Sequence, residues 1–318
     1  MAKKEEFGNN NIGATLQYYR ESYRISQRKL CHGLCSISTL SRIEAGERDA
    51  DTLLLETLLE RLGKVPNQFE LILSDFDYEA YLMRNEILQK IEEKDIDRAY
   101  RLIDSYEEII DYKVSPHKQC IMVSQAHLNE LEGGKVETTI DLLLEAISCT
   151  VPDFNTKELS DYFLSNSEFN IIIDVLQKMI EAKMIEKADK ILDQAIDYLF
   201  WHSYMENTKR LYPKVAAIGG KFYLEKKKYD KAMELCEKGL ESHKGSYNME
   251  YLGELLYIKA FITEVNLKAE GDWKDRKKNK CLQLFLEAYH VLDFSGYDTE
   301  SDRIRTHLEE VYQWEDID

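Results

Sequence analysis

The residues best suited to contact a partner lie in one short stretch, residues 26–48, which reads SQRKLCHGLCSISTLSRIEAGER. Its second half is rich in serine and threonine and carries two arginines. Hydroxyl groups donate and accept hydrogen bonds, and guanidinium groups donate several while keeping a positive charge. A surface of this kind is equipped for recognition of a polar or anionic partner by hydrogen bonding.

Catalytic chemistry finds little support in the sequence. The chain contains no glycine-rich phosphate loop, no nucleophile motif and no paired Asp/His cluster with ligand spacing. Cys31, His32 and Cys35 come closest to a metal site, but two cysteines at i and i+4 in an apolar pattern are more typical of a core. The six scattered cysteines are typical of free thiols in a reducing cytosol. We expect no enzymatic activity, no cofactor and no metal.

Two short helices and a tight turn are predicted to position residues 26–48. A first helix is predicted over residues 12–23. Ser26 is a good N-cap for the next helix, whose inward residues are Leu30, Cys31 and Leu34. The chain is then expected to turn at Leu34 and Cys35.

A third helix is predicted from Ser36, which can serve as its N-cap. Its inward residues are expected to be Ile37, Leu40 and Ile43, and its more outward residues are Ser38, Thr39, Ser41 and Arg42. Gly46 fits the left-handed position that ends helices. A fourth, leucine-rich helix is expected from about Asp51 to Gly63, and a connecting helix over residues 67–75.

The rest of the chain is predicted to be helical as well. Its 318 residues include only four prolines and 14 glycines, so few residues interrupt a helix. From about residue 78 the pattern suggests long helices in pairs. A loose repeat places small residues at one position of each pair, with spacings of 40, 49, 44 and 49: Ala99, Thr139, Ala188, Ala232 and Cys281. Seven residues further along the chain, a second position holds Tyr106, Ala146, Ala195, Gly239 and Ala288, and all of these except Tyr106 are small.

Small residues at these positions allow paired antiparallel helices to pack closely, and each pair buries its face against its neighbours. The expected architecture is therefore a superhelical stack. A loop insertion is predicted around residues 269–280, with the run from Lys274 to Lys280 as a solvated loop, and a capping helix is predicted over residues 301–314.

The charge is distributed unevenly along the chain. The net charge of −17 argues against nucleic acid as a partner. However, residues 1–66 hold 10 basic and 9 acidic residues, a net of +1, whereas the remainder carries −18. The sequence contains no 18-residue apolar segment, and the N-terminus has no apolar run. We therefore expect no signal peptide, no membrane span and a cytoplasmic location.

Residues 12–63 resemble the XRE/Cro/C1-type helix-turn-helix family. The resemblance is carried by Ile12-Gly13, Leu16, Arg20, Ser26-Gln27, Leu30 and the run from Ser38 to Arg48. The turn is one residue shorter than in the phage repressors, and LCHGLCSISTLSRIEAGE is instead similar to the variant in Rgg/PlcR-type (RRNPP) regulators. In that group such a domain precedes about five degenerate tetratricopeptide repeats.

This resemblance implies an all-α protein with an N-terminal helix-turn-helix domain and a C-terminal right-handed superhelix of repeats. The expected boundaries are a DNA-binding domain over residues 1–66, a linker helix over 67–77 and a sensor and dimerisation domain over 78–318. Because a domain with a net charge of +1 neutralises few phosphates alone, a homodimer on two half-sites is expected.

Carried over position by position, the resemblance implies DNA contacts from the two central helices. Gln27 is expected to contact a phosphate. Base edges are expected to be read by Ile37, Ser38 and Thr39. Phosphates or nearby bases are expected to be contacted by Ser41, Arg42 and Arg48, and Ser36 is counted among these DNA contacts. Each residue also has a simpler interpretation. Ser36 can be only a cap, Ile37 only core, Arg42 a partner of a helix-surface carboxylate, and Gln27 and Arg48 ordinary surface residues.

The resemblance also implies that the concave side of the stack binds a short signalling peptide, with asparagine side chains holding its backbone. An amide both donates and accepts, so it can satisfy a peptide unit taken from water. The small-residue register places the following residues on or near that side: Arg84, Asn129, Asn166, Asn170, Gln177, Lys214 and Lys221. As an alternative, each is an ordinary solvated helix residue.

The sequence thus predicts a DNA-binding transcription regulator, with double-stranded DNA, a signalling peptide of quorum-sensing type and a second copy of the chain as partners. A second hypothesis keeps the helix-turn-helix but makes the stack a platform for protein partners, with no peptide pheromone. The sequence barely separates the two.

Overall fold

The computed structural model describes residues 11–65, 71, 74–111, 114–154, 157–244 and 249–314. All regular elements in this part of the chain are helices, so the predicted all-α class is confirmed. The chain divides into two compact units, Met1–Asn207 and Thr208–Asp318. Within the described residues, no helix is both long and apolar enough to cross a membrane. Most of the linker helix predicted over residues 67–77 lies outside the described residues.

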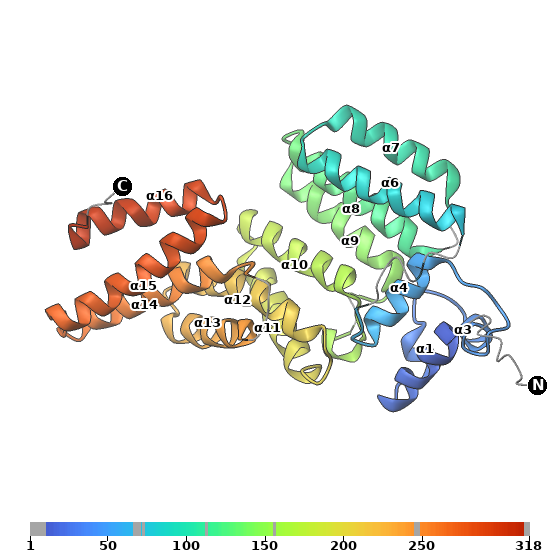
Figure 1. The fold of residues 1–318 in the computed structure, drawn as a ribbon, viewed down its shortest axis with the longest axis horizontal. Helices are drawn as coiled ribbons and strands as arrows, with labels where there is room; N and C mark the ends of the chain where they lie inside the picture. Colours follow the sequence, from blue (N-terminus) through green and yellow to red (C-terminus); the bar gives the residue numbers. More distant parts are fainter. Residues whose placement is uncertain are drawn as a thin grey trace, which may run out of the picture. The chain divides into compact units, whose positions relative to one another are not determined.

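The first unit begins with a four-helix domain formed by α1 (Asn11–Ser22), α2 (Gln27–Leu30), α3 (Ile37–Glu44) and α4 (Thr52–Arg61). We call this part, residues 11–65, the N-terminal domain. Figure 1 shows it at the blue end of the chain, next to the green helices of the same unit.

Side-chain caps set the starts of α2, α3 and α4, and the caps at Ser26 and Ser36 were predicted. The Ser26 hydroxyl accepts a hydrogen bond from Lys29 N, and the Ser36 hydroxyl accepts one from Thr39 N at 3.0 Å. Asp51 caps α4 through Leu53 N and Leu54 N. Caps of this kind satisfy backbone donors that a helix leaves open and stabilise it by about 1 kcal/mol each.

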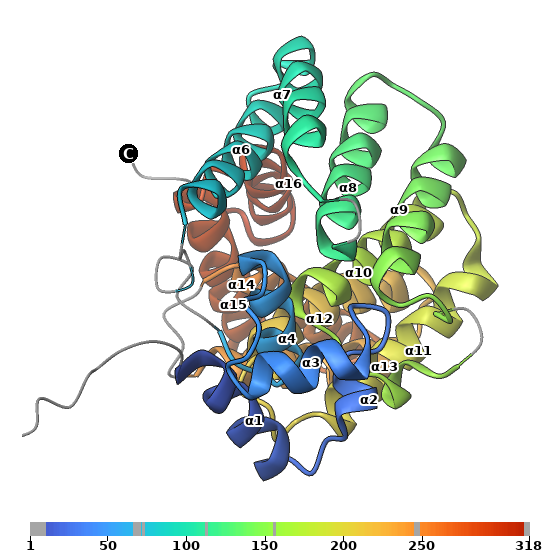
Figure 2. The same ribbon diagram turned by 90° about the vertical axis from the view of Figure 1, so that its right-hand side faces the viewer.

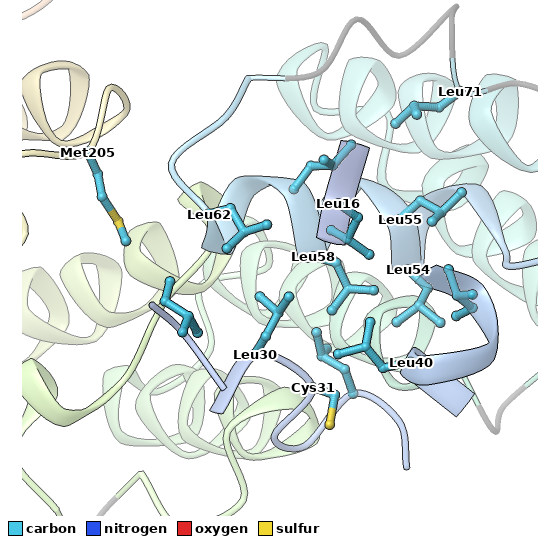
Figure 3. Packing of buried hydrophobic residues seen from close by; sticks show 14 residues of the cluster. Leu16, Leu30, Cys31, Leu40, Leu54, Leu55, Leu58, Leu62, Leu71 and Met205 are labelled. Atoms are coloured by element: carbon cyan, nitrogen blue, oxygen red, sulfur yellow. The ribbon is translucent and has the colours of Figure 1, made fainter. Parts of the chain in front are cut away.

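A leucine core joins the four helices (Figure 3). Leu16, Leu30, Leu40, Leu58 and Leu62 are fully buried in it. Gly13 lets α1 cross α3 closely, because a Cβ at this position would lie 2.1 Å from the carbonyl oxygen of Ile43.

One inward residue was predicted wrongly. Ile37 was expected to face the core with Leu40 and Ile43, but it is 48% exposed, while Leu40 and Ile43 are buried. Ile37 is the first residue of α3, and this first turn extends beyond the leucine core that covers the following turns.

Three helix pairs and a short 3-10 helix complete the first unit. They are α6 (Asp75–Glu92) with α7 (Ile96–Ile109), α8 (Ser115–Leu131) with α9 (Val136–Thr150), η1 (Leu159–Asp161), and α10 (Asn166–Glu181) with α11 (Ile185–Trp201). Each pair packs on the next through α6 against α8 and α9 against α10. We call α6–α11 the first repeat array.

The second unit has two helix pairs followed by a cap. It consists of α12 (Thr208–Glu225) with α13 (Tyr229–His243), α14 (Leu252–Ala269) with α15 (Asp275–Phe294), α16 (Asp298–His307) and the π-helical turn η2 (Leu308–Tyr312). The capping helix predicted over residues 301–314 corresponds to α16 and η2.

The loop predicted over Lys274–Lys280 is wrong, because α15 begins at Asp275 and only residues 270–274 connect α14 to it. No glycine or proline follows Gly271 up to Lys280. The Asp275 carboxylate lies in the first turn of α15, where it favours a helix start. A run of basic residues is therefore not by itself evidence for a loop.

The small-residue register is fully buried in all five helix pairs. Ala99, Ala188, Ala232 and Cys281 are 0% exposed and Thr139 is 2% exposed. At the second position, Tyr106, Ala146, Ala195 and Ala288 are 0% exposed, and Gly239 is buried. A Cβ at Gly239 would approach the Ala216 Cβ to 2.6 Å, so the helices α12 and α13 meet closely there.

Candidate nucleic-acid interface and hollows of the repeat helices

The outer face of α3 gathers most of the predicted DNA contacts on one exposed surface. Six of these residues are exposed, and Thr39 is half-buried. The exposed residues are Ser36, Ile37, Ser38, Ser41, Arg42 and, just after the helix, Arg48. Figure 2 shows α3 at the front of the N-terminal domain, with no helix of the first repeat array drawn over it. We call these seven residues the α3 face.

Hydrogen bonds already organise part of the α3 face. The hydroxyls of Ser36 and Thr39 lie 2.9 Å apart, and Arg48 Nη1 donates to Thr39 Oγ1 at 3.4 Å. Ser36 therefore caps α3, and its DNA contact stays a prediction. Ser38 and Arg42 have no side-chain partner among the described residues, so their donors are open to a ligand.

Gln27 is tied into the domain rather than free. Its amide Nε2 donates to Glu44 at 2.7 Å, and Glu44 also accepts two hydrogen bonds from Arg20, at 2.6 and 2.8 Å. Glu44 and Arg20 are buried, and the hydrogen bond that Arg20 donates to Glu44 raises the pKa of Arg20. This pair fixes α1 against α3. Sequence reasoning missed it, although Arg20 and Glu44 both lie in the motif. The phosphate contact of Gln27 stays a prediction.

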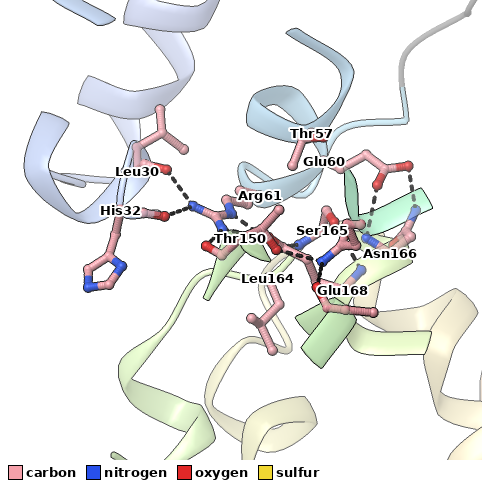
Figure 4. A network of polar contacts seen from close by, with 12 residues as sticks. Leu30, His32, Thr57, Glu60, Arg61, Thr150, Leu164, Ser165, Asn166 and Glu168 are labelled. Atoms are coloured by element: carbon pink, nitrogen blue, oxygen red, sulfur yellow. Dashed lines mark hydrogen bonds and ion pairs between the residues drawn. The ribbon is translucent and has the colours of Figure 1, made fainter. Parts of the chain in front are cut away.

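A buried ion pair docks the N-terminal domain on the first repeat array (Figure 4). Arg61, at the end of α4, donates to Glu168 of α10 through Nε at 3.0 Å and Nη2 at 2.5 Å. Its remaining donors reach the carbonyl oxygens of Leu30, His32 and Thr150 at 2.9, 2.7 and 3.0 Å. The guanidinium group thus connects α2, α4, α9 and α10.

Arg61 also controls the ionisation of the Glu168 carboxyl group. Burial raises the pKa of the Glu168 carboxyl, but the charge of Arg61 and its hydrogen bonds outweigh burial and hold that pKa below its usual range. Glu168 further accepts from Ser165 N at 2.7 Å, in a capping box at the start of α10. Both charges are therefore satisfied inside the protein, as a buried pair requires.

Beside this pair, Glu60 connects α4 to the start of α10. It accepts from Asn166 N at 3.0 Å and from Asn166 Nδ2 at 3.4 Å, while Asn207 Nδ2 donates to Asn166 Oδ1 at 3.1 Å. Burial, together with the neighbouring Glu56, raises the pKa of Glu60 to about 7 despite the hydrogen bonds from Asn166.

A third connection runs through His117 of α8. Its Nε2 lies 2.9 Å from Asp51 Oδ2, the cap of α4, and its Nδ1 lies 2.5 Å from the Tyr106 hydroxyl. Close backbone contact adds to this connection, because a Cβ at Gly33 would lie 1.9 Å from the Thr150 carbonyl oxygen. The N-terminal domain is thus held on α7–α10 by hydrogen bonds, charge and shape.

Three of the predicted peptide contacts have partners inside the protein. Arg84 is 9% exposed and donates to the Tyr106 hydroxyl at 3.3 Å. Asn129 donates to Thr139 Oγ1 at 2.9 Å and so ties α8 to α9. Asn166 takes part in the contacts of Glu60 described above, and Asn170, one turn later, is half-buried. Their role toward a peptide stays a prediction.

Two other predicted contacts line hollows. Gln177 is exposed in a cavity of about 350 Å³ between α8–α9 and α10, whose lining includes Asp174, Glu130 and Lys178. Lys221 lies in a cavity of about 510 Å³ within the second unit. Lys214, from the same helix as Lys221, is half-buried. Each unit thus carries one hollow that includes a predicted residue.

The hollow of the second unit is the more apolar of the two by its lining. Its apolar residues come from α12, α14, α15 and α16: Leu224, Tyr257, Phe261, Leu292 and Ile304. Charged residues of both signs surround them, with Lys221 4.0 Å from Glu254. We call this cavity the α12–α16 hollow. Its size is within the range of about 300 to 1,000 Å³ typical of small-ligand pockets.

Metal chemistry finds no site in the described part of the chain, where no group of three or more His, Cys, Asp or Glu side chains could hold an ion. All six cysteines are free thiols. Cys31 and Cys35, the nearest sequence candidates, belong to or pack against the leucine core.

Comparison with known proteins identifies the N-terminal domain and the fold. Residues 16–66 match the model of the helix-turn-helix family. A search of curated protein sequences finds no significant match. Among solved structures, the chain is similar to PlcR of Bacillus thuringiensis in its apo form, with 14% identity and a TM-score of 0.56 over 94% of this chain and 99% of PlcR. PlcR in complex with the peptide PapR7 and DNA gives 14% identity and a TM-score of 0.53 over 93% and 99%.

Proposed function

We propose that this chain, a helix-turn-helix protein with the fold of PlcR, is a transcription regulator whose DNA binding responds to a short signalling peptide. The exposed α3 face is the observation that carries the DNA-binding part. It presents hydroxyls, a guanidinium group and an exposed isoleucine methyl surface from the second helix of the motif. This is the element that enters the major groove in helix-turn-helix proteins.

Within this face, Arg42 is proposed to make the strongest contact, because guanidinium groups bind phosphates and guanine edges with paired hydrogen bonds. Ser38 and Ile37 lie at the exposed N-terminal end of α3, where base edges are read. Ile37 can contact a thymine methyl group, which is consistent with its exposure.

The peptide part rests on the likeness to PlcR, which has been solved with a peptide and DNA, and on the α12–α16 hollow. An apolar floor with charges of both signs at its edge suits a short peptide that brings one large apolar side chain and a charged group. Lys221 is the predicted residue that we assign to this site.

We further propose a homodimer. The N-terminal domain has little net charge, so a single copy neutralises few phosphates, and two copies on two half-sites double these contacts. A cytoplasmic location fits this role.

One experiment tests both parts. Binding of the purified chain to DNA from its own promoter region is measured against salt, with and without a panel of short peptides encoded beside the gene. DNA binding that weakens steeply with salt and shifts with one peptide supports the proposal. DNA binding that no peptide changes favours the alternative, in which the repeat helices are a platform for protein partners.

A further inference from the structure

A second cavity lies within the first unit, between the N-terminal domain and the first repeat array. Its volume is about 450 Å³. One wall is formed by α2 and the turn after it, and the other by residues 151, 157 and 161–163. The lining residues are Ser26, Arg28, Lys29, His32, Arg61, Val151, Lys157, Asp161, Tyr162 and Phe163. We call it the α2 cavity.

The walls of the α2 cavity are held in place by the docking network. Arg61 lines the cavity and is bonded to the carbonyl oxygens of Leu30 and His32 on one wall and to Thr150 and Glu168 on the other. Tyr162 fixes the second wall through a hydrogen bond from its hydroxyl to Asp153 O at 2.7 Å. The cavity is therefore preformed.

Positive charge gathers in this cavity although the chain as a whole is acidic, at −17. Arg28 and Lys29 come from one wall and Lys157 from the other, and Asp161 is the one carboxylate among the lining residues. No carboxylate pairs with Arg28 or Lys29 in the described part of the chain. Asp153 balances Lys157 and lies 3.3 Å from His32 Nε2.

A buried ring nitrogen without a hydrogen-bond partner and two aromatic rings lie beside these charges. The Nδ1 atom of His32 is buried with no hydrogen-bond partner. Lys29 lies 5.9 Å from the centre of the Phe163 ring, and Lys157 lies 5.6 Å from that of Tyr162. The cationic groups are thus placed over an aromatic floor, which keeps them near the cavity.

We propose that the α2 cavity binds a phosphate group. Cations on two facing walls match an anion with oxygens that point in several directions, as a phosphate has, better than a planar carboxylate. Two sources can supply that group. A small organic phosphate with a planar part, such as a nucleotide, would fill the volume and use the aromatic floor; DNA would instead offer a backbone phosphate to α2.

The experiment has one arm for each source. In the first, ADP and pyrophosphate are titrated into the full chain without DNA at low ionic strength by calorimetry. A free phosphate ligand predicts saturable binding of one molecule per chain, weakened at least about tenfold in Lys157→Ala and in Arg28→Ala. Lys118→Ala, an exposed lysine of α8 outside the cavity, is the matched control and keeps full binding.

In the second arm, DNA affinity is measured against salt for the same variants. A backbone phosphate in the cavity predicts that Lys157→Ala lowers the salt slope by about one, although Lys157 lies in the repeat segment and outside the α3 face. Because Lys157 is exposed, its replacement is expected to leave the melting temperature nearly unchanged. The proposal is overturned if neither phosphate ligand binds saturably and the salt slope of Lys157→Ala equals that of the control. The first arm is independent of the proposed regulator function.

Discussion

Arg61 and Glu168 stand 107 positions apart in the chain, yet they form an ion pair with two hydrogen bonds whose side chains are 2% and 0% exposed. One lies at the end of the helix-turn-helix domain and the other in the first turn of α10. A buried pair of this kind contributes little net stability compared with apolar residues, but it penalises any separation of its partners. It therefore ties the position of the N-terminal domain to the first repeat array.

Arg61→Ala is expected to destabilise the first unit by about 3 to 5 kcal/mol, because Glu168 stays buried without a counter-charge. The double variant with Glu168→Ala should lose less than the sum of the two single changes. Unfolding by urea, followed by circular dichroism, measures both. Arg98→Ala, which breaks a surface pair with Glu86 in the same unit, should cost below about 1 kcal/mol. Additive single changes would contradict the proposed pairing.

Gly33→Ala tests the close backbone contact between the two parts of the first unit. Gly33 has a φ of +73°, and its added Cβ would meet Thr150 O at 1.9 Å. Gly133 is a matched control, since its φ is +72° but no atom lies within 4 Å of an added Cβ. Gly133→Ala should cost about 1 kcal/mol from backbone strain alone, and Gly33→Ala at least about 2 kcal/mol more. Equal losses in melting temperature would show that the contact is not as close as described.

Sequence patterns predicted the features that depend only on local structure, such as helix caps and the buried small residues. Ser26 and Ser36 were recognisable as caps because a hydroxyl before an apolar pattern meets the next turn's backbone donors. The small-residue register predicted burial at Ala99 and Ala188, since close helix packing selects small side chains wherever the helices cross. These constraints act within one helix or one helix pair.

Long-range pairing could not be predicted in this way. Nothing near Arg61 in the sequence indicates that Glu168 is its partner, and an acidic residue in a helix's first turn has an ordinary explanation as part of a capping box. Asn166 was likewise selected for its spacing from Asn170, whereas its amide bonds to Glu60 of another domain. Exposure of Ile37 depended on where the leucine core ends, which the helical period alone does not define.

Arg42→Ala is expected to weaken binding to promoter DNA by about tenfold or more and to lower the salt slope by about one if the contact is to phosphate. Arg101→Ala is the matched control, because Arg101 is an exposed arginine on α7 in the first repeat array. Filter or fluorescence binding at several salt concentrations gives both quantities. Equal behaviour of the two variants would remove Arg42 from the proposed DNA interface.

Lys221→Ala is expected to weaken peptide binding at the α12–α16 hollow by about tenfold, with little change in folding because the side chain is exposed. The control is Lys280→Ala, an exposed lysine of α15 outside the hollow. A peptide that raises the melting temperature of the unmodified chain provides the assay. If both variants respond to that peptide like the unmodified chain, its site lies elsewhere.

Glu60 predicts a pH dependence of stability in the first unit. Burial raises its folded-state pKa to about 7 from an ordinary value of 4.5. Between these two values the folded protein keeps a proton that the unfolded chain has released, so this group's contribution falls as pH rises through that window and is constant outside it. The loss is on the order of 1 to 3 kcal/mol.

Glu60→Gln should flatten this part of the stability profile, because an amide does not titrate. Glu234 supplies the control in the second unit. A hydrogen bond from Lys238 and the charge of that lysine lower the pKa of the Glu234 carboxyl, so its contribution is lost only as pH falls below 4.5. Glu234→Gln should therefore leave the window between pH 4.5 and 7 unchanged. Urea midpoints are measured across both pH windows. If the slope of stability against pH between 4.5 and 7 is unchanged in Glu60→Gln, the pH dependence belongs to another group.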